Sequence, residues 1–116
     1  MIDDVFCKII KGELGAEVVY KDKDFWVIKD INPQAPVHLL IIPVKHYNSL
    51  EDFLEEESAL LGKSLLVAHK VAHQTGLAEK GYRLILNEGE YGGKLVPHLH
   101  IHLLGGKKLG PKIVKD

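Results

Sequence analysis

The sequence predicts one α+β domain spanning residues 1–116, with a five-stranded antiparallel sheet, one long helix and a short N-terminal helix. Three observations support this prediction. Short apolar runs rich in valine, isoleucine and leucine recur along the chain and end at glycine, proline or charged residues, as strands do. One central segment carries apolar residues at three- and four-residue steps, the period of an amphipathic helix. A length of 116 residues is enough for one hydrophobic core, and neither a linker nor an internal repeat divides the chain.

The first half of the chain predicts a short helix, a hairpin and a central strand. Residues 3–12, DDVFCKIIKG, combine an acidic N-cap, an apolar face and Gly12 as a helix stop. A strand at residues 18–20 and a return strand at residues 25–29 are joined by the turn KDKD. The segment INPQAP contains two prolines and is expected to be a loop. The run VHLLIIPV at residues 37–44 then predicts a central strand covered on both faces.

The second half predicts the long helix and two further strands. Residues 50–75 carry the helical repeat, and Gly76 is well placed to end it. Residues 81–87, GYRLILN, predict a strand, and residues 88–94, EGEYGGK, predict a glycine-bearing loop. The last strand is expected at residues 96–106, VPHLHIHLLGG.

Composition limits the classes of function. Fifteen lysine and arginine residues against sixteen aspartate and glutamate residues give a formal net charge of −1, which argues against electrostatic capture of nucleic acid or of an anionic membrane. The single cysteine, Cys7, rules out an intramolecular disulfide and fits a reducing compartment. The start MIDDVFCKII lacks the features of a secretory signal, and no apolar run is long enough to span a bilayer. We therefore expect a cytoplasmic protein that binds neither nucleic acid nor membranes.

The most informative stretch is VPHLHIHLLGG, in which His98, His100 and His102 alternate with leucine and isoleucine. Alternate side chains of a strand share one face, so the three imidazoles are expected to form a row with about 7 Å between neighbours. Three of the seven histidines lie within these five residues, which is unusual for a solvated strand face. The row therefore predicts either a metal site or a catalytic site.

A metal site receives limited support from the rest of the sequence. A His-x-His strand with one further histidine, here His38, is a known way to hold catalytic zinc. However, no acidic or cysteine ligand lies near the row in the sequence. His69 and His73 lie four residues apart on the predicted helix, but the glutamate of a zinc-protease motif is missing, and both are interpreted as helix surface.

A catalytic row accounts for more of the neighbouring sequence. Neutral imidazole is a good nucleophile at neutral pH, because its ordinary pKa is about 6.5. Just upstream, the loop contains Gly89, Gly92 and Gly93, whose backbone can approach a phosphate closely. Asn87 ends the preceding strand and can donate a hydrogen bond there. A nucleophile, donors for an anion and a tight loop are the parts of a phosphoryl-transfer site.

The motif HLHIHLL at residues 98–104 resembles the signature of the histidine triad family of nucleotide hydrolases and transferases. The segments FCKIIKGE, DINPQAPVHLLIIPVKH, GYRLILNEG and HLLGGKKLG extend the resemblance over nearly the whole chain, toward the branch of purine nucleoside phosphoramidases. The resemblance implies the histidine triad fold, a homodimer, a purine nucleotide substrate, and catalysis without a metal or other cofactor.

The resemblance also implies a role for individual residues. His100 matches the nucleophile that attacks the α-phosphorus and becomes a nucleotidyl-histidine, and His102 matches the histidine that contacts the phosphate. His98 and His38 match the two histidines that support and orient the nucleophile and handle protons. The residues implied to bind the nucleotide are Asp30 at the ribose hydroxyls, Asn87 near the sugar and phosphate, Gly93, Lys94, Leu95 and Val96 before the motif, and Phe6, Ile9, Ile28 and Ile31 around the purine.

Two departures from the family pattern matter. The branch reads Gly-Gly-Gln-Ser-Val before the motif, whereas this chain has Lys94 and Leu95 in place of the glutamine and serine, so the serine hydroxyl near the scissile bond is absent. Some relatives hold a structural zinc through a Cys-x-x-Cys pair and two histidines. In this chain Asp4 replaces the first cysteine, and we expect no zinc, because the remaining set is incomplete: Cys7, His46 and His98.

Together these features predict a hydrolase that splits the P–N bond of adenosine 5′-monophosphoramidate-like substrates. One alternative is a dinucleoside polyphosphate hydrolase of the same family, which would use the same nucleophile on a P–O bond; the LLGG continuation of the motif favours the phosphoramidase. The other alternative is a nucleotide-binding regulatory module whose turnover is incidental or lost, and Leu95 is the best argument for it.

Overall fold

The sheet is built from five strands: β1 (Val18–Lys21), β2 (Phe25–Lys29), β3 (Val37–Pro43), β4 (Tyr82–Leu86) and β5 (Ile101–Gly105). Neighbouring strands are antiparallel in the order β1-β2-β3-β5-β4. The last strand is therefore inserted between the central strand β3 and the edge strand β4. This insertion places the end of the chain's histidine motif in the middle of the sheet.

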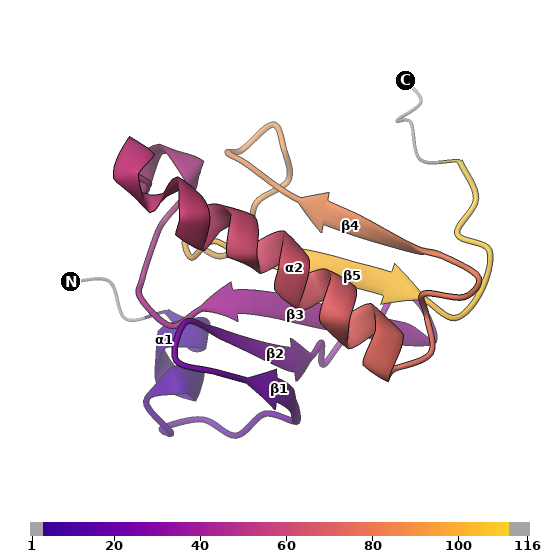
Figure 1. Cartoon of the computed structure of the whole chain (residues 1–116). Helices are drawn as coiled ribbons and strands as arrows, with labels where there is room; N and C mark the ends of the chain where they lie inside the picture. Colours follow the sequence, from indigo (N-terminus) through magenta and orange to yellow (C-terminus); the bar gives the residue numbers. More distant parts are fainter. Residues whose placement is uncertain (1–3, 112–116) are drawn as a thin grey trace.

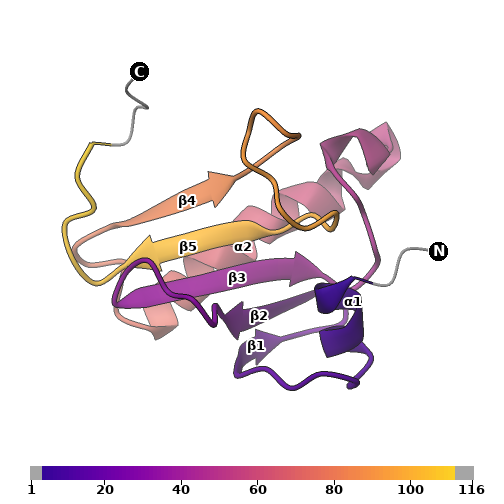
Figure 2. The ribbon, with the colours of Figure 1, turned by 180° about the vertical axis from the view of Figure 1, so that it is seen from behind.

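The computed structural model describes residues 4–111, which form three layers (Figure 1, Figure 2). Helix α2, Ser58–Gln74, crosses one face of the sheet, and the short helix α1, Val5–Ile10, packs against the other face. The predicted fold class is confirmed. Within the described residues, no helix has the length and apolar character needed to cross a membrane.

Strand alternation divides the core between the two faces of the sheet. Leu39 and Ile41 of β3 pack with Leu103 of β5 against α2. The side chains between them on β3 face the opposite way, toward α1, so both faces of β3 are covered as predicted. The cluster on this second face consists of Phe6, Ile9, Ile28, Leu40 and Ile42.

Helix α1 forms as its sequence predicts. Asp4 is its N-cap, and its carboxylate Oδ1 accepts a hydrogen bond from the backbone N–H of Cys7 at 2.8 Å. Beyond the helix, Gly12 has φ +82°, in the left-handed region that favours glycine. The helix therefore has a fixed start, which sets the position of the Asp4 carboxylate.

Helix α2 begins eight residues later than the predicted start at residue 50, and two short 3₁₀ turns, Leu50–Asp52 and Glu55–Glu57, take up the difference. Local side chains divert the backbone here. The Ser49 hydroxyl accepts from the N–H of Glu51, and the Glu57 carboxylate accepts from the N–H of Leu54. Such side-chain bonds compete with the helical pattern. The apolar repeat alone did not reveal them.

The last strand begins at Ile101, whereas the alternation predicted a start at residue 96. Pro97 has no N–H to give to a neighbouring strand. The N–H of Leu99 donates to the carbonyl of Tyr47 at 2.6 Å, outside the pairing with β3. Because only His102 of the three histidines lies on a strand, the predicted row of three imidazoles on one strand face is wrong.

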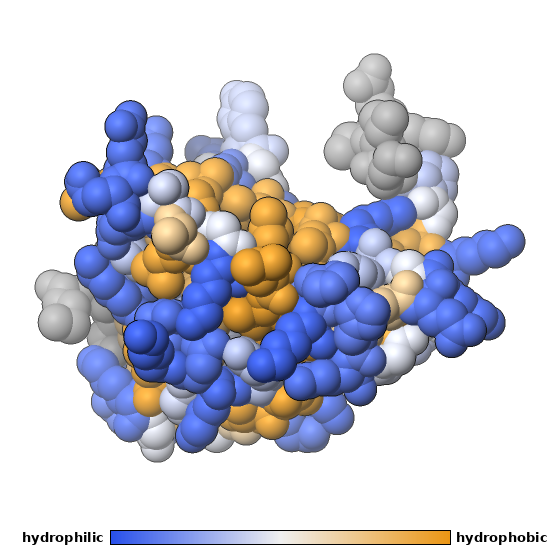
Figure 3. Space-filling view, viewed as in Figure 1, coloured by the Kyte–Doolittle hydropathy of each residue, from blue (hydrophilic) through white to orange (hydrophobic). Residues whose placement is uncertain are grey.

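The outer surface of α2 carries exposed apolar side chains. Leu65 and Leu66 expose 55% and 69% of their surface. Figure 3 shows hydrophobic side chains gathered in the middle of this face of the molecule.

Candidate active site

A cavity of 410 Å³ lies on the α1 side of the sheet, between α1, the end of β2, the loop that follows β4 and the histidine motif. One part of its wall is apolar, and the other part is polar. Phe6, Ile9, Ile28 and Leu40 supply apolar side chains, and Asp30, Asn87, His100 and His102 supply polar ones. The cavity therefore offers an apolar end for a flat ring and a polar end for an anion.

Strand register explains how His102 reaches this cavity. It lies opposite Leu40 of β3, and Leu40 lies opposite Ile28 of β2. All three side chains are on the sheet face that α1 covers, and all three line the cavity. His38 lies two residues before Leu40 and therefore shares this face, although it does not line the cavity.

His100 is held by the backbone of the preceding histidine. Its Nδ1 lies 2.7 Å from the carbonyl oxygen of His98. A carbonyl can only accept, so Nδ1 carries the hydrogen and Nε2 keeps a lone pair. Burial is the main cause that lowers the pKa of His100 below its usual value, which favours the neutral ring. The site thus presents a neutral imidazole with its nucleophilic nitrogen defined.

A second chain of hydrogen bonds fixes the tautomer of His102. The backbone N–H of Gln34 donates to Nδ1 of His38 at 3.0 Å, so the hydrogen of His38 is on Nε2. That Nε2 lies 2.9 Å from Nδ1 of His102, which accepts, and His102 therefore carries its own hydrogen on Nε2. Burial, with His100 and His38 nearby, lowers the pKa of His102 to about 4. His102 is therefore a neutral donor at neutral pH.

Asp30 and Asn87 lie at the polar end of the cavity. Asp30 follows β2, and its Oδ1 accepts from the N–H of Asn32 at 2.8 Å, while its Oδ2 lies 3.4 Å from Nε2 of His38. The Asn87 amide donates to the carbonyl of Gly92 at 2.6 Å and so closes the loop after β4. A Cβ on Gly92 would lie 2.1 Å from the carbonyl oxygen of Glu88, so only glycine fits there.

The remaining residues implied by the resemblance divide into those that line the cavity and one that does not. Ile31, Gly93, Leu95 and Val96 line the cavity, and Ile31 and Leu95 are 89% and 92% exposed. Lys94 does not line it, since its ammonium group donates to the carbonyl of Asn48. The sequence allowed two interpretations of three apolar residues, as core residues or as residues around the purine. Both agree with their positions, because Phe6, Ile9 and Ile28 are buried in the core and also form part of the cavity wall.

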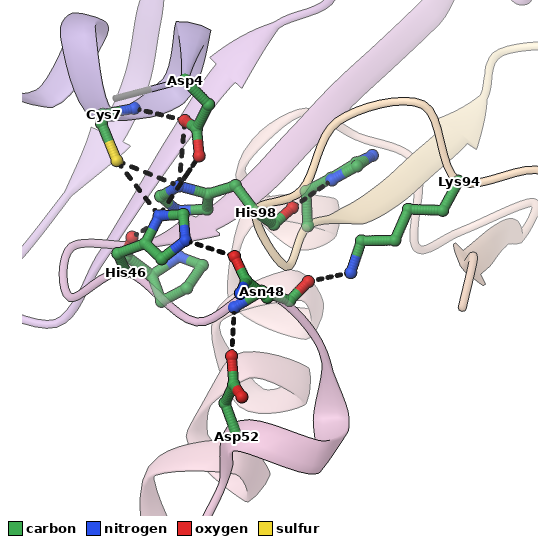
Figure 4. Close-up of polar contacts among 9 residues, drawn as sticks. Asp4, Cys7, His46, Asn48, Asp52, Lys94 and His98 are labelled. Atoms are coloured by element: carbon green, nitrogen blue, oxygen red, sulfur yellow. Dashed lines mark hydrogen bonds and ion pairs between the residues drawn. The ribbon is translucent and has the colours of Figure 1, made fainter. Parts of the chain in front are cut away.

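His98 lies outside the cavity wall. Its ring is fully buried and contacts Asp4, Cys7 and the carbonyl oxygen of Pro43. Figure 4 shows this ring pointing toward the start of α1, with His46 beside it. The contribution of His98 to the cavity is therefore its backbone carbonyl, which accepts from His100.

Sequence reasoning missed two contributors to the site. The N–H of Gln34 sets the tautomer of His38, and no side-chain pattern can reveal a backbone donor. Leu40 was assigned only to the central strand, yet its spacing of two from His38 was a usable signal that it shares the face of that histidine.

Among the residues that the structure describes, two groups of side chains have the residue types of metal ligands. Asp30, His38 and His102 form one group, and the donor atoms within each group lie within 4.8 Å of one another. The other group lies at the start of α1 and consists of Asp4, Cys7, His46 and His98.

Comparison with known proteins shows which family this chain resembles in sequence and fold. A model of the HIT domain matches residues 11–109. The purine nucleoside phosphoramidase of Escherichia coli strain K12 is 45% identical over 111 residues, which cover 96% of this chain and 93% of that protein. A HIT family hydrolase from Clostridium thermocellum is 50% identical, with a TM-score of 0.92 over 98% of this chain and 99% of its own. A histidine triad protein from Clostridium difficile is 41% identical, with a TM-score of 0.91 over 96% of each chain.

These matches span nearly the whole chain. They include the histidine motif, of which His100 and His102 line the cavity. The chain therefore belongs to the histidine triad (HIT) family, in company with the hydrolases described above.

Proposed function

We propose that this protein is a purine nucleoside phosphoramidase, a hydrolase of the P–N bond between adenosine 5′-monophosphate and an amine. The observation that supports it best is the hydrogen bond from His100 Nδ1 to the His98 carbonyl, which leaves Nε2 as the nucleophile of a neutral ring in the cavity wall. The relative from Escherichia coli with this printed activity is 45% identical. That relative supports the substrate class, and the hydrogen-bond geometry supports the chemistry.

The reaction has two displacements at phosphorus. His100 Nε2 attacks the α-phosphorus, a P–N bond to the enzyme forms, and the P–N bond to the amine breaks. Water then attacks the nucleotidyl-histidine and releases the nucleoside monophosphate. The hydrogen on His102 Nε2 and the backbone N–H groups of the loop around Gly93 stabilise the phosphate oxygens as charge builds on them.

The departing amine needs a proton. The resemblance gives proton handling to His98 and His38, but the ring nitrogens of His98 are engaged at a site outside the cavity wall. We therefore assign to His38 the orientation of His102 through their 2.9 Å contact, and the amine takes its proton from the water whose hydroxide then cleaves the nucleotidyl-histidine. His98 then serves to orient His100 through its carbonyl.

Binding of the nucleotide follows the two ends of the cavity. The purine lies against Phe6, Ile9 and Ile28, with Ile31 at the exposed edge. Asp30 accepts hydrogen bonds from the ribose hydroxyls, because it lines the cavity and its carboxylate has acceptor capacity beyond its contacts with the N–H of Asn32 and the His38 ring. Asn87 shapes the loop that holds the phosphate.

The leaving group distinguishes the phosphoramidase from the polyphosphate hydrolase. A second cavity of 800 Å³ adjoins the first and shares Gly93, Leu95 and Val96 with it. Its wall includes Glu51, Glu88 and Glu90, and among residues 4–111 the only lysine or arginine in that wall is Lys94. A polyphosphate would bring negative charge against these carboxylates, whereas an amine would not. The charge of this cavity therefore favours the amine.

The direct test compares turnover of an adenosine 5′-phosphoramidate with turnover of a diadenosine polyphosphate under the same conditions. We expect the phosphoramidate to have the larger kcat/KM. A larger value for the polyphosphate would support the alternative hydrolase. Nucleotide binding without turnover of either substrate would support the regulatory module.

The implied homodimer is also a proposal, supported by the exposed leucines on α2. Leu66→Glu would place a charge in an apolar interface between two copies, which association does not tolerate. We expect wild-type protein to have the mass of a dimer by light scattering and the variant that of a monomer. Glu55→Lys, outside α2, is the control for a change of surface charge. A wild-type monomer would contradict the proposal.

Replacing the nucleophile should abolish the chemistry and spare binding. His100→Ala is expected to lower kcat by at least about 10³-fold, as loss of other covalent nucleophiles does. Nucleotide affinity should change by less than about tenfold, because the phosphate donors remain. Mass spectrometry of quenched wild-type enzyme should detect a nucleotide adduct on His100. His69→Ala, on α2, is the control, and substantial activity in His100→Ala would refute the assignment.

Asp30→Ala tests the ribose contact. A contact made equally in the ground state and the transition state affects KM more than kcat, so KM should rise more than kcat falls. Steady-state kinetics with ribose and 2′-deoxyribose substrates provides the measurement, and the deoxyribose substrate should lose less. Equal losses on both sugars would indicate that Asp30 acts through His38 instead.

Leu95→Ser tests this chain's departure from the family pattern. The resemblance places a hydroxyl near the scissile bond, and a hydrogen bond to a charged group is worth about 1.5–3 kcal/mol. That is about ten- to a hundredfold in rate. We expect Leu95→Ser to raise kcat for poor amine leaving groups and to change little for activated ones. Because Leu95 is 92% exposed, it is not a packed wall whose loss would loosen the site.

Leu95→Ala is the control for this experiment, since it removes the leucine without adding a hydroxyl. It should not reproduce the gain. A fall in kcat across all leaving groups with Leu95→Ser would contradict the prediction.

A further inference from the structure

Helix α2, which crosses the outer face of the sheet (Figure 1), carries two exposed histidines, His69 and His73. They lie four residues apart, so their side chains share one face of the helix, about one turn from each other. Their ring centroids are 4.5 Å apart, and the ring planes meet at 74°. Neither residue lines the two cavities of the candidate active site, so this histidine pair is a separate feature of the molecule.

The ring nitrogens of the pair differ from those of the other histidines in the chain. The other five rings each have a nitrogen in contact with a polar group: His38, His46, His98, His100 and His102. Among residues 4–111, neither His69 nor His73 has a hydrogen bond or an ion pair, and each ring contacts only the other. A neutral imidazole has one nitrogen lone pair, and here both lone pairs are available to a ligand from solvent.

The separation of the two rings fits two imidazoles bound to one ion. Metal–nitrogen bonds of about 2.0–2.1 Å place each ring centroid about 3.2 Å from the ion. Two such centroids are about 4.5 Å apart when the bonds meet at about 90°, and about 5.2 Å apart at the tetrahedral angle. The observed 4.5 Å corresponds to the right-angled arrangement. That arrangement is typical of Cu²⁺ and Ni²⁺ with nitrogen and oxygen ligands.

The position of the pair on α2 is compatible with a bound cation. His73 lies in the last turn of the helix, where the unpaired carbonyl groups give the helix end a partial negative charge. Lys70, the lysine between the two histidines, directs its ammonium group to the ring of Tyr20 on β1, 5.1 Å from the ring centroid. The helix dipole therefore favours an ion at His73, and the intervening lysine is engaged with another element.

The residue pattern indicates a binding site and not a second catalytic centre. A catalytic zinc has three protein ligands and one open position. The segment HKVAH supplies two imidazoles and lacks the glutamate of the zinc-protease motif. Two ligands leave the remaining coordination positions to water or to donor atoms of another molecule.

We propose that His69 and His73 chelate one divalent transition-metal ion of the copper and nickel class on the surface of α2. The ion links the last two turns of the helix. Its order of affinity follows the general series for nitrogen ligands, so Cu²⁺ binds more tightly than Ni²⁺. The sequence predicts both histidines as helix surface, and their exposure is what leaves the two rings available to the ion.

The first experiment is a calorimetric titration with Ni²⁺ of wild type and of His73→Gln/Gln74→His. This variant exchanges two exposed neighbours, so the composition is unchanged but the histidines lie five residues apart and no longer share a face. We expect wild type to bind about one Ni²⁺ ion per chain at least about tenfold more tightly than the variant does, because the second imidazole binds intramolecularly. Any other site in the chain contributes equally to both proteins. Equal titrations would overturn the proposal.

The second experiment tests whether the pair is accessible from outside the molecule. Untagged protein is applied to a Ni²⁺-charged chelating resin and eluted with imidazole. Wild type should be retained, and both His69→Ala and His73→Gln/Gln74→His should lose that retention. Gln74→Ala, which changes a neighbour and keeps the pair, is the control and should be retained as wild type is. Wild type that fails to bind the resin, or variants that bind it equally well, would contradict the proposal.

The third experiment measures the effect of the ion on folding stability. An ion that binds the folded helix should raise the melting temperature, so Ni²⁺ should raise that of wild type more than that of His73→Gln/Gln74→His. Equal shifts in the two proteins would count against a site at this pair. Every readout is metal binding or folding stability, so the outcome is independent of the proposed phosphoramidase activity.

Discussion

The pairing of β3 with β5 is the constraint on which the rest of the site depends. Its register places His102 opposite Leu40 and brings His38, on the same face of β3, within 2.9 Å of His102. The pairing stops at Ile41 and Ile101, so the residues just before β5 are free of the sheet's alternation. His98 and His100 can then turn to different environments. The motif spaces its histidines evenly. Because β5 begins only at Ile101, His100 and His102 line the cavity, whereas His98 lies outside the cavity wall.

The fold was largely predictable from the sequence because each strand and the short helix have local signals. β2, β3 and β4 lie within the residues that alternation and turn residues indicated, and Asp4 caps α1 as its residue type suggested. Two boundaries were not predictable. The start of α2 depends on bonds from Ser49 and Glu57 to nearby N–H groups, and the start of β5 depends on the contact between Leu99 and Tyr47. These contacts overrule the apolar period and cannot be obtained from it.

The same limit applied to the site. Most of the residues that the resemblance implied line one cavity, although His38, Lys94 and His98 do not, and alternation alone would have supplied only His102 correctly. Backbone groups set which ring nitrogen carries the hydrogen: the carbonyl of His98 for His100, the N–H of Gln34 for His38 and the carbonyl of Pro43 for His98. Backbone groups leave no trace in the residue types, so only the folded arrangement assigns the tautomers.

Asp4 joins the start of α1 to two histidines from distant segments of the chain. Its Oδ1 accepts the N–H of Cys7 and caps α1, while its Oδ2 faces His46 and His98. A carboxylate is a good cap here, because it accepts from a backbone N–H and also interacts favourably with the helix dipole near the N-terminus. That helix start carries Phe6 and Ile9 into the cavity wall, so the cap at residue 4 also fixes the position of the apolar side chains in that wall.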